Sequence, residues 1–134
     1  MAQPINSRIT NTEPLARQLL VEFFGCKAPL LGQAEALEQA LVEAAVSADA
    51  KVVNSLFHKF APHGISGIVL IAESHLSIHT WPEYRYAALD VFTCSNTVDP
   101  YRIKSALAQS LKAGKTECRL VRRGDRLRPG PDDR

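Results

Sequence analysis

The sequence predicts an α+β protein, a two-layer α/β sandwich in which two helices cover one face of a mostly antiparallel sheet. Strand-like stretches and two stretches of helical periodicity follow one another in the order β-α-β-β and then β-β-α-β. The chain has 134 residues, of which 46% are hydrophobic and 22% are charged. This length and composition are typical of one folded domain with its own core.

In chain order, the first expected element is a strand over residues 15–25, where apolar and polar side chains alternate loosely. A helix follows over residues 32–49, because its apolar residues recur at spacings of three and four. That apolar stripe consists of Leu37, Leu41, Ala44, Ala45 and Ala48. Residues 51–60 alternate again and predict a second strand. A turn around Pro62 separates it from residues 65–72, whose β-branched residues favour a buried strand.

The second half of the chain begins with a short alternating strand at residues 76–80, followed by another strand over residues 85–94. A polar loop then leads to Pro100, which suits the first turn of a helix. Residues 101–112 are expected to form that helix, because three of their apolar residues fall on one stripe. These are Ile103, Leu107 and Leu111. Residues 115–121 predict the last strand.

The two ends of the chain differ from the body in composition. Residues 1–14 are expected to form a flexible N-terminal arm, and residues 122–134, rich in Arg, Pro and Gly, a flexible C-terminal tail. The tail carries five Arg and three Asp, so it accounts for the whole formal net charge of +2. A nucleic-acid partner is not expected, because binding would require a basic stripe on the folded body.

No segment indicates a membrane or secretory destination. The chain has no apolar run close to the roughly 20 residues that span a bilayer, and its start lacks the apolar region of a secretory signal. We therefore expect a cytoplasmic protein that does not bind a membrane.

Two common kinds of site are disfavoured by residue spacing. Metal binding is not expected, because His75 and His79 are four residues apart on a predicted strand, which separates them by about 13 Å. The three cysteines, Cys26, Cys94 and Cys118, have neither disulfide-framework nor zinc-ribbon spacing. Ordinary serine hydrolysis is also disfavoured, because the chain lacks a GxSxG nucleophile elbow.

Residues 64–94, GISGIVLIAESHLSIHTWPEYRYAALDVFTC, resemble the central part of the bacterial and archaeal S-adenosylmethionine decarboxylase proenzymes. The ESHLSIHTWPE core is long and chemically unusual, so the signal is specific. The likeness extends over residues 15–121 through three further segments. These are LLVEFFGC at residues 19–26, FHKFAPHG at 57–64 and VDPYRI at 98–103.

The resemblance implies that the chain makes its own pyruvoyl cofactor. The Ser74 hydroxyl would attack the Glu73 carbonyl and turn the peptide bond into an ester. Elimination would then leave a β chain of residues 1–73 and an α chain of residues 74–134 that begins with a pyruvoyl group. The attack requires a strained backbone at the scissile bond and a group that stabilises the tetrahedral oxyanion.

Further residues acquire roles through the same resemblance. His79 would be the processing base, Ser66 would support ester formation, and Cys94 would donate the proton that replaces CO₂. The ketone made from Ser74 would bind the substrate amine as a Schiff base and act as an electron sink. Phe60 and Trp81 match aromatic positions that stack adenine in the family.

The remaining implications concern substrate and assembly. Glu83 matches the carboxylate that holds the ribose hydroxyls in the family. The expected reaction converts S-adenosyl-L-methionine to CO₂ and the decarboxylated aminopropyl donor of spermidine biosynthesis. A small sheet with helices on one side leaves its other face uncovered, so a homodimer of cleaved αβ protomers is expected.

The sequence departs from the family pattern at a few positions. Gln18 stands where the family commonly has His, and Ser95 and Arg85 stand where Gly is usual. Arg85 is a candidate specificity residue, because it could pair with Glu83 or bind a substrate carboxylate. An arginine or ornithine decarboxylase therefore stays open as an alternative. A second alternative is a catalytically inactive regulatory partner subunit.

Structural interpretations of individual site residues also stay open. Cys94 could fill the core, Phe60 and Trp81 could be packing aromatics, and His79 could be a hydrogen-bonded core histidine. His75 is expected to be structural rather than catalytic. The sequence does not indicate whether an activator is required.

Overall fold

The structure is a computed structural model and describes residues 13–127. Within these residues the strands form one six-stranded sheet in the order β2-β3-β4-β5-β1-β6, and neighbouring strands are antiparallel. The strands are β1 (Ala16–Phe24), β2 (Val52–Lys59), β3 (Ile65–Ile71), β4 (Ser74–Trp81), β5 (Tyr86–Thr93) and β6 (Lys115–Arg123).

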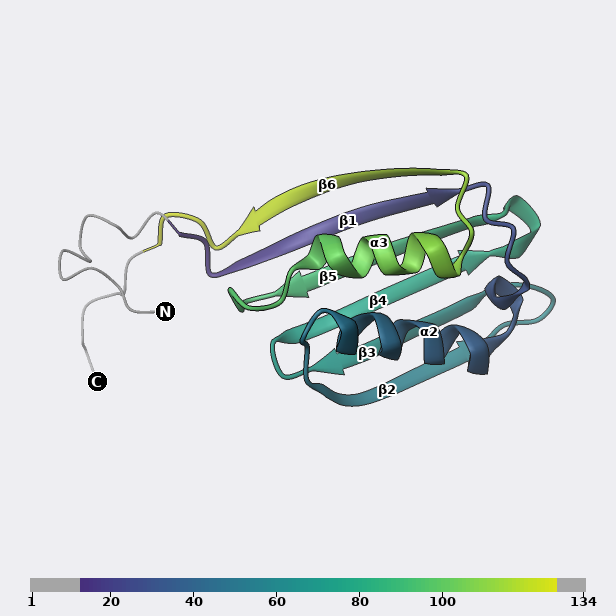
Figure 1. Cartoon of the computed structure of the whole chain (residues 1–134), viewed down its shortest axis with the longest axis horizontal. Helices are drawn as coiled ribbons and strands as arrows, with labels where there is room; N and C mark the ends of the chain where they lie inside the picture. Colours follow the sequence, from purple (N-terminus) through teal and green to yellow (C-terminus); the bar gives the residue numbers. More distant parts are fainter. Residues whose placement is uncertain (1–12, 128–134) are drawn as a thin grey trace.

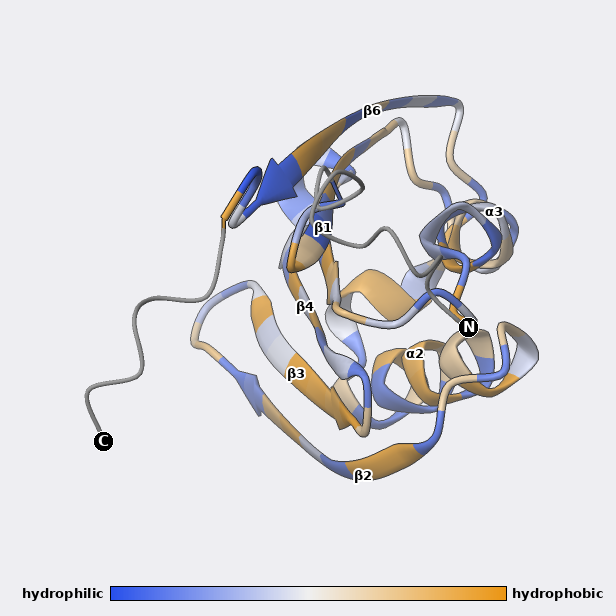
Figure 2. Cartoon of the chain, turned by 90° about the vertical axis from the view of Figure 1, so that its left-hand side faces the viewer, coloured by the Kyte–Doolittle hydropathy of each residue, from blue (hydrophilic) through white to orange (hydrophobic). Residues whose placement is uncertain are grey.

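Two α-helices, α2 (Ala34–Ser47) and α3 (Pro100–Ser110), lie across the same face of the sheet (Figure 1). The view in Figure 2 shows the sheet curving around both helices, and no helix of residues 13–127 covers its other face. The predicted α+β sandwich with two helices on one face is confirmed. None of the helices within residues 13–127 is long and apolar enough to cross a membrane.

The core lies between the helices and the inner face of the sheet. The apolar stripes predicted for both helices are buried there. They meet alternate residues of the central strands, because the strand period of two sends every second side chain inward. The large apolar side chains of β1, β4 and β5 that are almost fully buried are Leu19, Val21, Phe23, Leu76, Ile78, Leu89 and Val91.

The face of the sheet that points away from the helices, here called the open face, combines apolar and polar side chains. On β4 it carries His75, Ser77, His79 and Trp81, because these residues alternate with the buried Leu76, Ile78 and Thr80. On β2 and β3 it exposes three large apolar side chains. They are Leu56 with 73%, Ile68 with 40% and Leu70 with 46% of their surface accessible.

Several element boundaries differ from the predicted ones. Strand β4 begins at Ser74 rather than at residue 76, because Ser74 already pairs with Ile71 on one side and Thr93 on the other. Strand β6 continues to Arg123, two residues beyond its predicted end, because β1 offers pairing partners as far as Ala16. Most of the predicted arm and tail, residues 1–12 and 128–134, lies outside the described residues.

Two short 3₁₀-helices were not predicted. They are η1 (Pro29–Gly32) and η2 (Pro82–Tyr84), and each begins with a proline. Because η1 occupies the residues before α2, the first helix starts at Ala34 instead of residue 32.

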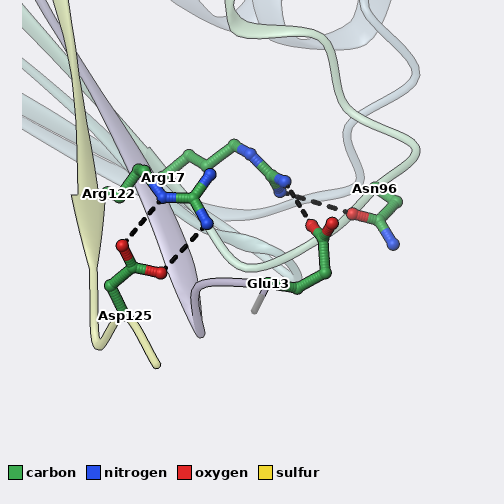
Figure 3. A network of polar contacts seen from close by, with 5 residues as sticks. All are labelled: Glu13, Arg17, Asn96, Arg122 and Asp125. Atoms are coloured by element: carbon green, nitrogen blue, oxygen red, sulfur yellow. Dashed lines mark hydrogen bonds and ion pairs between the residues drawn. The ribbon is translucent and has the colours of Figure 1, made fainter. Parts of the chain in front are cut away.

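Polar contacts gather at the adjacent ends of β1 and β6 (Figure 3). The Arg17 guanidinium donates to the Glu13 carboxylate at 2.6 Å and lies 3.5 Å from the Asn96 side-chain oxygen. Arg122 donates two hydrogen bonds, at 2.9 and 3.0 Å, to the carboxylate of Asp125. This bidentate contact keeps the pKa of Asp125 below its usual range.

Candidate active site

The Glu73–Ser74 peptide bond lies in a tight hairpin between β3 and β4. Ile71 pairs with Ser74, so only Ala72 and Glu73 remain to make the turn. Ser74 has a φ of 147°, a region that favours glycine and costs other residues about 1–3 kcal/mol. The bond that the resemblance identifies as the cleavage site is therefore next to a strained residue.

The carbonyl oxygen of Glu73 accepts two hydrogen bonds from one residue. The backbone N–H of Cys94 donates to it at 3.0 Å, and the Cys94 thiol donates at 3.3 Å. Cys94 reaches this position because it follows Thr93, which pairs with Ser74. Two donors aimed at a carbonyl oxygen form the arrangement that stabilises a tetrahedral oxyanion.

The turn is also anchored to the residue that precedes β2. The Glu73 carboxylate accepts a hydrogen bond from the Lys51 backbone N–H at 3.3 Å. The backbone N–H of Ala72 donates to the Lys51 carbonyl at 2.8 Å. These contacts restrict the turn on the side opposite Cys94.

His75 lies beside the Ser74 hydroxyl, with its Nδ1 atom 3.5 Å from Ser74 Oγ. Its ring stacks on Phe92 with centroids 5.5 Å apart and an angle of 3° between the planes. The Arg123 guanidinium lies 5.7 Å from the centroid of the Phe92 ring and donates a 2.6 Å hydrogen bond to Gln18. Glu73, Ser74, His75 and Cys94 together are called the cleavage cluster below.

A second group of residues surrounds a cavity at the end of the sheet where β3 begins and β4 ends. The cavity has a volume of about 240 Å³. Its lining contains every residue of the sequence-predicted site that is absent from the cleavage cluster, apart from Arg85. These residues, called the pocket cluster, are Phe60, Ser66, His79, Trp81 and Glu83.

The polar members of the pocket cluster are held by strand pairing. Ser66 lies directly opposite His79 across β3 and β4, and Ser66 Oγ is 2.7 Å from His79 Nδ1. Beneath them, the buried Thr80 hydroxyl accepts from the Ile65 N–H at 3.0 Å and donates to the Leu31 carbonyl at 2.8 Å. Thr80 thereby links the wall of the cavity to η1.

The cleavage cluster and the pocket cluster are well separated within one chain. Ser74 begins β4 and His79 lies near its other end, and the five residue steps from one to the other span about 16 Å. The structure therefore brings Ser74 together with Cys94 and Glu73, but it does not bring Ser74 together with His79 or Ser66. No element in residues 13–127 shortens this distance, because β4 is a regular central strand.

Arg85 occupies neither cluster. It ends η2 with a φ of 52°, a left-handed conformation that explains why glycine suits this position. It lines a separate cavity of about 440 Å³ together with Lys27 and Pro82. Among the described residues, Arg85 forms no ion pair with Glu83.

An aromatic patch next to the pocket cluster was missed by sequence reasoning. Trp81 lies 5.4 Å from the ring of Tyr86, which in turn lies 5.5 Å from Phe24. The Tyr86 hydroxyl donates to the Glu22 carboxylate; burial, reinforced by this acceptor, raises the pKa of Tyr86 to about 12. In the sequence, only the close spacing of the aromatic residues in WPEYRY, residues 81–86, could have indicated this aromatic patch.

The cysteines differ in environment. Cys94 is exposed and contacts the Glu73 carbonyl, so it does not fill the core. Cys26 is buried, and its burial raises the pKa of the thiol to about 11. Within residues 13–127, no three His, Cys, Asp or Glu side chains are grouped so as to hold a metal ion.

Comparison with known proteins gives a consistent result. A sequence profile of S-adenosylmethionine decarboxylase matches residues 17–124. The chain is 50% identical to the S-adenosylmethionine decarboxylase proenzyme of Thermosipho melanesiensis over 99 residues, which cover 74% of this chain and 76% of that protein. The proenzyme of Syntrophomonas wolfei is 43% identical over 122 residues, which cover 91% and 95% of the two chains.

A solved structure agrees with these sequence comparisons. The adenosylmethionine decarboxylase from Aquifex aeolicus superposes with a TM-score of 0.79 at 30% identity, covering 90% of this chain and 99% of that one. The sequence profile spans most of the chain, and the proenzymes match it at high identity over most of their length. The chain therefore belongs to the S-adenosylmethionine decarboxylase family.

Proposed function

We propose that this protein is a self-processing, pyruvoyl-dependent decarboxylase of S-adenosyl-L-methionine. Its products would be CO₂ and the decarboxylated aminopropyl donor of spermidine biosynthesis, formed in the cytoplasm. The observation that carries the proposal is the geometry of the Glu73–Ser74 bond. This bond is next to a strained residue, and both hydrogen-bond donors of Cys94 point at its carbonyl oxygen.

Processing begins at the Ser74 hydroxyl. Its oxygen attacks the Glu73 carbonyl carbon, the C–N bond breaks, and an ester replaces the amide. The negative charge that develops on the carbonyl oxygen is stabilised by the N–H and S–H of Cys94. Relief of the unfavourable φ at Ser74 favours the rearrangement, because the ester frees the peptide nitrogen.

Elimination completes the cut. A base removes the Cα proton of Ser74, the bond from Cβ to the ester oxygen breaks, and Glu73 leaves with its new carboxylate. The dehydroalanine that remains at residue 74 hydrolyses to a pyruvoyl group and ammonia. His79 is the proposed base for this step, because an imidazole accepts protons near neutral pH.

The residues around the cleavage site fit a pyruvoyl group, because a serine beside an exposed thiol supplies both its precursor and a proton donor. When present, the group supplies a ketone that condenses with an amine and withdraws electrons as CO₂ leaves. Cys94 would return a proton to the substrate carbon. The pocket cluster would hold the nucleoside, with Phe60 and Trp81 against adenine and Glu83 at the ribose hydroxyls.

The separation of the two clusters supports a homodimer of cleaved αβ protomers. A two-fold axis repeats each patch on both partners, so the cleavage cluster of one copy can face the pocket cluster of the other. The open face is suited to this contact, because it exposes Leu56, Ile68 and Leu70 beside polar groups. The proposed enzyme would therefore contain two composite sites.

The decisive experiment compares two serine variants of the same strand. We expect Ser74→Ala to abolish both chain cleavage and CO₂ release, as measured by mass spectrometry and a radiometric assay. Ser77→Ala is the matched control and should be processed normally, because the Ser77 hydroxyl donates to Asp90 on the open face and lies outside the cleavage cluster. Cleavage persisting in Ser74→Ala would refute the proposal, and an intact wild-type chain would indicate an inactive partner subunit.

The substrate is tested by offering processed enzyme three labelled compounds. We expect CO₂ release to be far faster from S-adenosyl-L-methionine than from arginine or ornithine, because the pocket cluster provides two aromatic rings and a carboxylate. The opposite ranking would select the arginine or ornithine decarboxylase. In that case Arg85, on the adjoining cavity, would be the first residue to replace.

A further inference from the structure

We propose that His75 is the base that accepts the Ser74 hydroxyl proton during ester formation, and that His79 acts only in the later elimination. This assignment of separate steps to the two histidines rests on the proposed self-processing. It assigns a catalytic role to a histidine that the sequence suggested to be structural.

Proximity is the first observation that supports this assignment. Among the described imidazoles, the one that contacts Ser74 Oγ is that of His75, through Nδ1 at 3.5 Å. His79 of the same chain is about 16 Å away along β4, and in either copy of a dimer the His79 Nδ1 is already 2.7 Å from Ser66 Oγ. Hydrogen bonds at catalytic groups are often long before reaction, so 3.5 Å is compatible with proton transfer after a small movement.

Orientation of the ring is the second observation. The His75 ring lies parallel to Phe92, and this stacking limits its rotation. Arg123 lies over Phe92 and is itself fixed by its hydrogen bond to Gln18. Side chains from β1, β5 and β6 therefore position a histidine on β4.

The chemistry of the step balances with these groups. The Ser74 oxygen forms a bond to the Glu73 carbonyl carbon while its proton passes to His75 Nδ1. The oxyanion is held by the two Cys94 donors. When the C–N bond breaks, the proton on His75 passes to the departing nitrogen of Ser74. The imidazole ends neutral, and no other reactant is consumed.

The charged and titratable groups around His75 come from three strands. Arg123 of β6 and Asp90 of β5 lie on the open face, and the Cys94 thiol follows β5. On the β3 side the residue opposite His75 is the apolar Leu70. Arg123 and Asp90 therefore need to be kept unchanged in any variant used to measure the pH dependence.

The test isolates ester formation from elimination. In a His79→Asn background, full-length chain is treated with saturating hydroxylamine, which cleaves the ester and leaves a hydroxamate on the 1–73 fragment. The rate of this cleavage then reports ester formation alone. Adding His75→Asn is expected to slow it about 10²-fold, the usual contribution of a general base. Adding His58→Gln, which changes another open-face histidine, is the matched control and should leave the rate unchanged.

The pH profile separates a base from a packing residue. With His75 present, the rate should fall as the pH is lowered, because a protonated imidazole cannot accept the serine proton. His75→Asn should lose this acid limb. If His75→Asn does not fold, Phe92→Leu replaces it, and we expect a several-fold slower ester formation because the ring loses its stacking partner.

The possible failures are distinguishable. If wild-type protein never cleaves, the proposed function fails. If wild-type protein cleaves but the hydroxylamine rate in His75→Asn stays within about threefold of its background, only the role of His75 is overturned. An unchanged rate in Phe92→Leu would overturn it in the same way.

Discussion

At the scale of single residues, the site depends on backbone geometry as much as on side-chain identity. In the proposed mechanism Ser74 reacts because it begins a strand with a φ of 147°, and the Glu73 carbonyl oxygen accepts a hydrogen bond from the Cys94 thiol. The sequence identified these residues through the family motif. It could not reveal that His75 contacts Ser74, because neighbours in a regular strand point to opposite faces. The contact exists because Ser74 is distorted at the turn.

The three thiols offer a prediction at this scale. In uncut Ser74→Ala protein, Ellman's reagent at mildly alkaline pH should react quickly with the exposed Cys94 and Cys118 and slowly with Cys26. Burial raises the pKa of Cys26 to about 11, so little of its reactive thiolate exists. Rapid reaction of all three thiols in folded protein would contradict this prediction.

The same shift has a consequence for stability. Because the pKa of Cys26 is higher in the folded state, the protonated thiol contributes to the free energy of unfolding. This contribution is complete below the pKa of the thiol in the unfolded chain, near 8.5, and is lost as the pH rises towards 11. Cys26→Ala should remove this part of the alkaline dependence. Denaturant unfolding of both proteins across that pH range provides the measurement.

At the scale of elements, the sequence predicted the strands and helices well because their periodicities are strong. It failed where proline starts a short 3₁₀ segment, as at Pro29 and Pro82, because four or fewer residues carry no detectable period. It also placed the start of β4 too late. The residues before Leu76 show no apolar alternation, and they join the strand because neighbours on both sides supply pairing partners.

The pairing of β2 with β3 gives a prediction for this scale. Gly67 lies opposite Phe57, and a Cβ atom at residue 67 would meet the Phe57 ring at 2.1 Å. Gly67→Ala should therefore lower the free energy of unfolding by about 1–3 kcal/mol, the usual cost of overpacking. Phe57→Leu in the same chain should restore part of the loss. Urea unfolding of the single and double variants tests the coupling, and additive effects would contradict the clash.

At the scale of the whole molecule, the fold was predictable but the arrangement of the site was not. The sequence grouped Ser66, Ser74, His79 and Cys94 within 29 consecutive residues, which suggested a single constellation. The strand register separates them, because Ser66 pairs with His79 while Ser74 pairs with Thr93 at the other end. Register depends on contacts between strands, so it could not be derived from spacing along the chain.

This separation predicts complementation between two defective chains. Ser74→Ala and His79→Asn proteins should each fail to produce a pyruvoyl chain when expressed alone. When coexpressed, the His79→Asn chain should be cut, because its intact Ser74 can meet the intact His79 of the other copy. Differently tagged chains resolved by mass spectrometry provide the measurement. The Ser74→Ala chain serves as the internal control, because it must stay whole.

Failure of this complementation would argue against composite sites. Equally, a protein that sediments as a single copy at working concentration while processing normally would be incompatible with them. In either case Ser74 and His79 of one chain would have to approach each other across about 16 Å. The regular pairing of β4 with both neighbouring strands opposes such a movement.

The strand order has one more consequence for a chain severed before Ser74. The N-terminal fragment would contain β1, β2 and β3, and the C-terminal fragment would contain β4, β5 and β6. Because β1 is inserted between β5 and β6, the fragments are interwoven rather than merely adjacent. Maturation would thus create two polypeptides that stay together without a covalent link, and neither could be exchanged for a fresh one unless the whole sheet came apart.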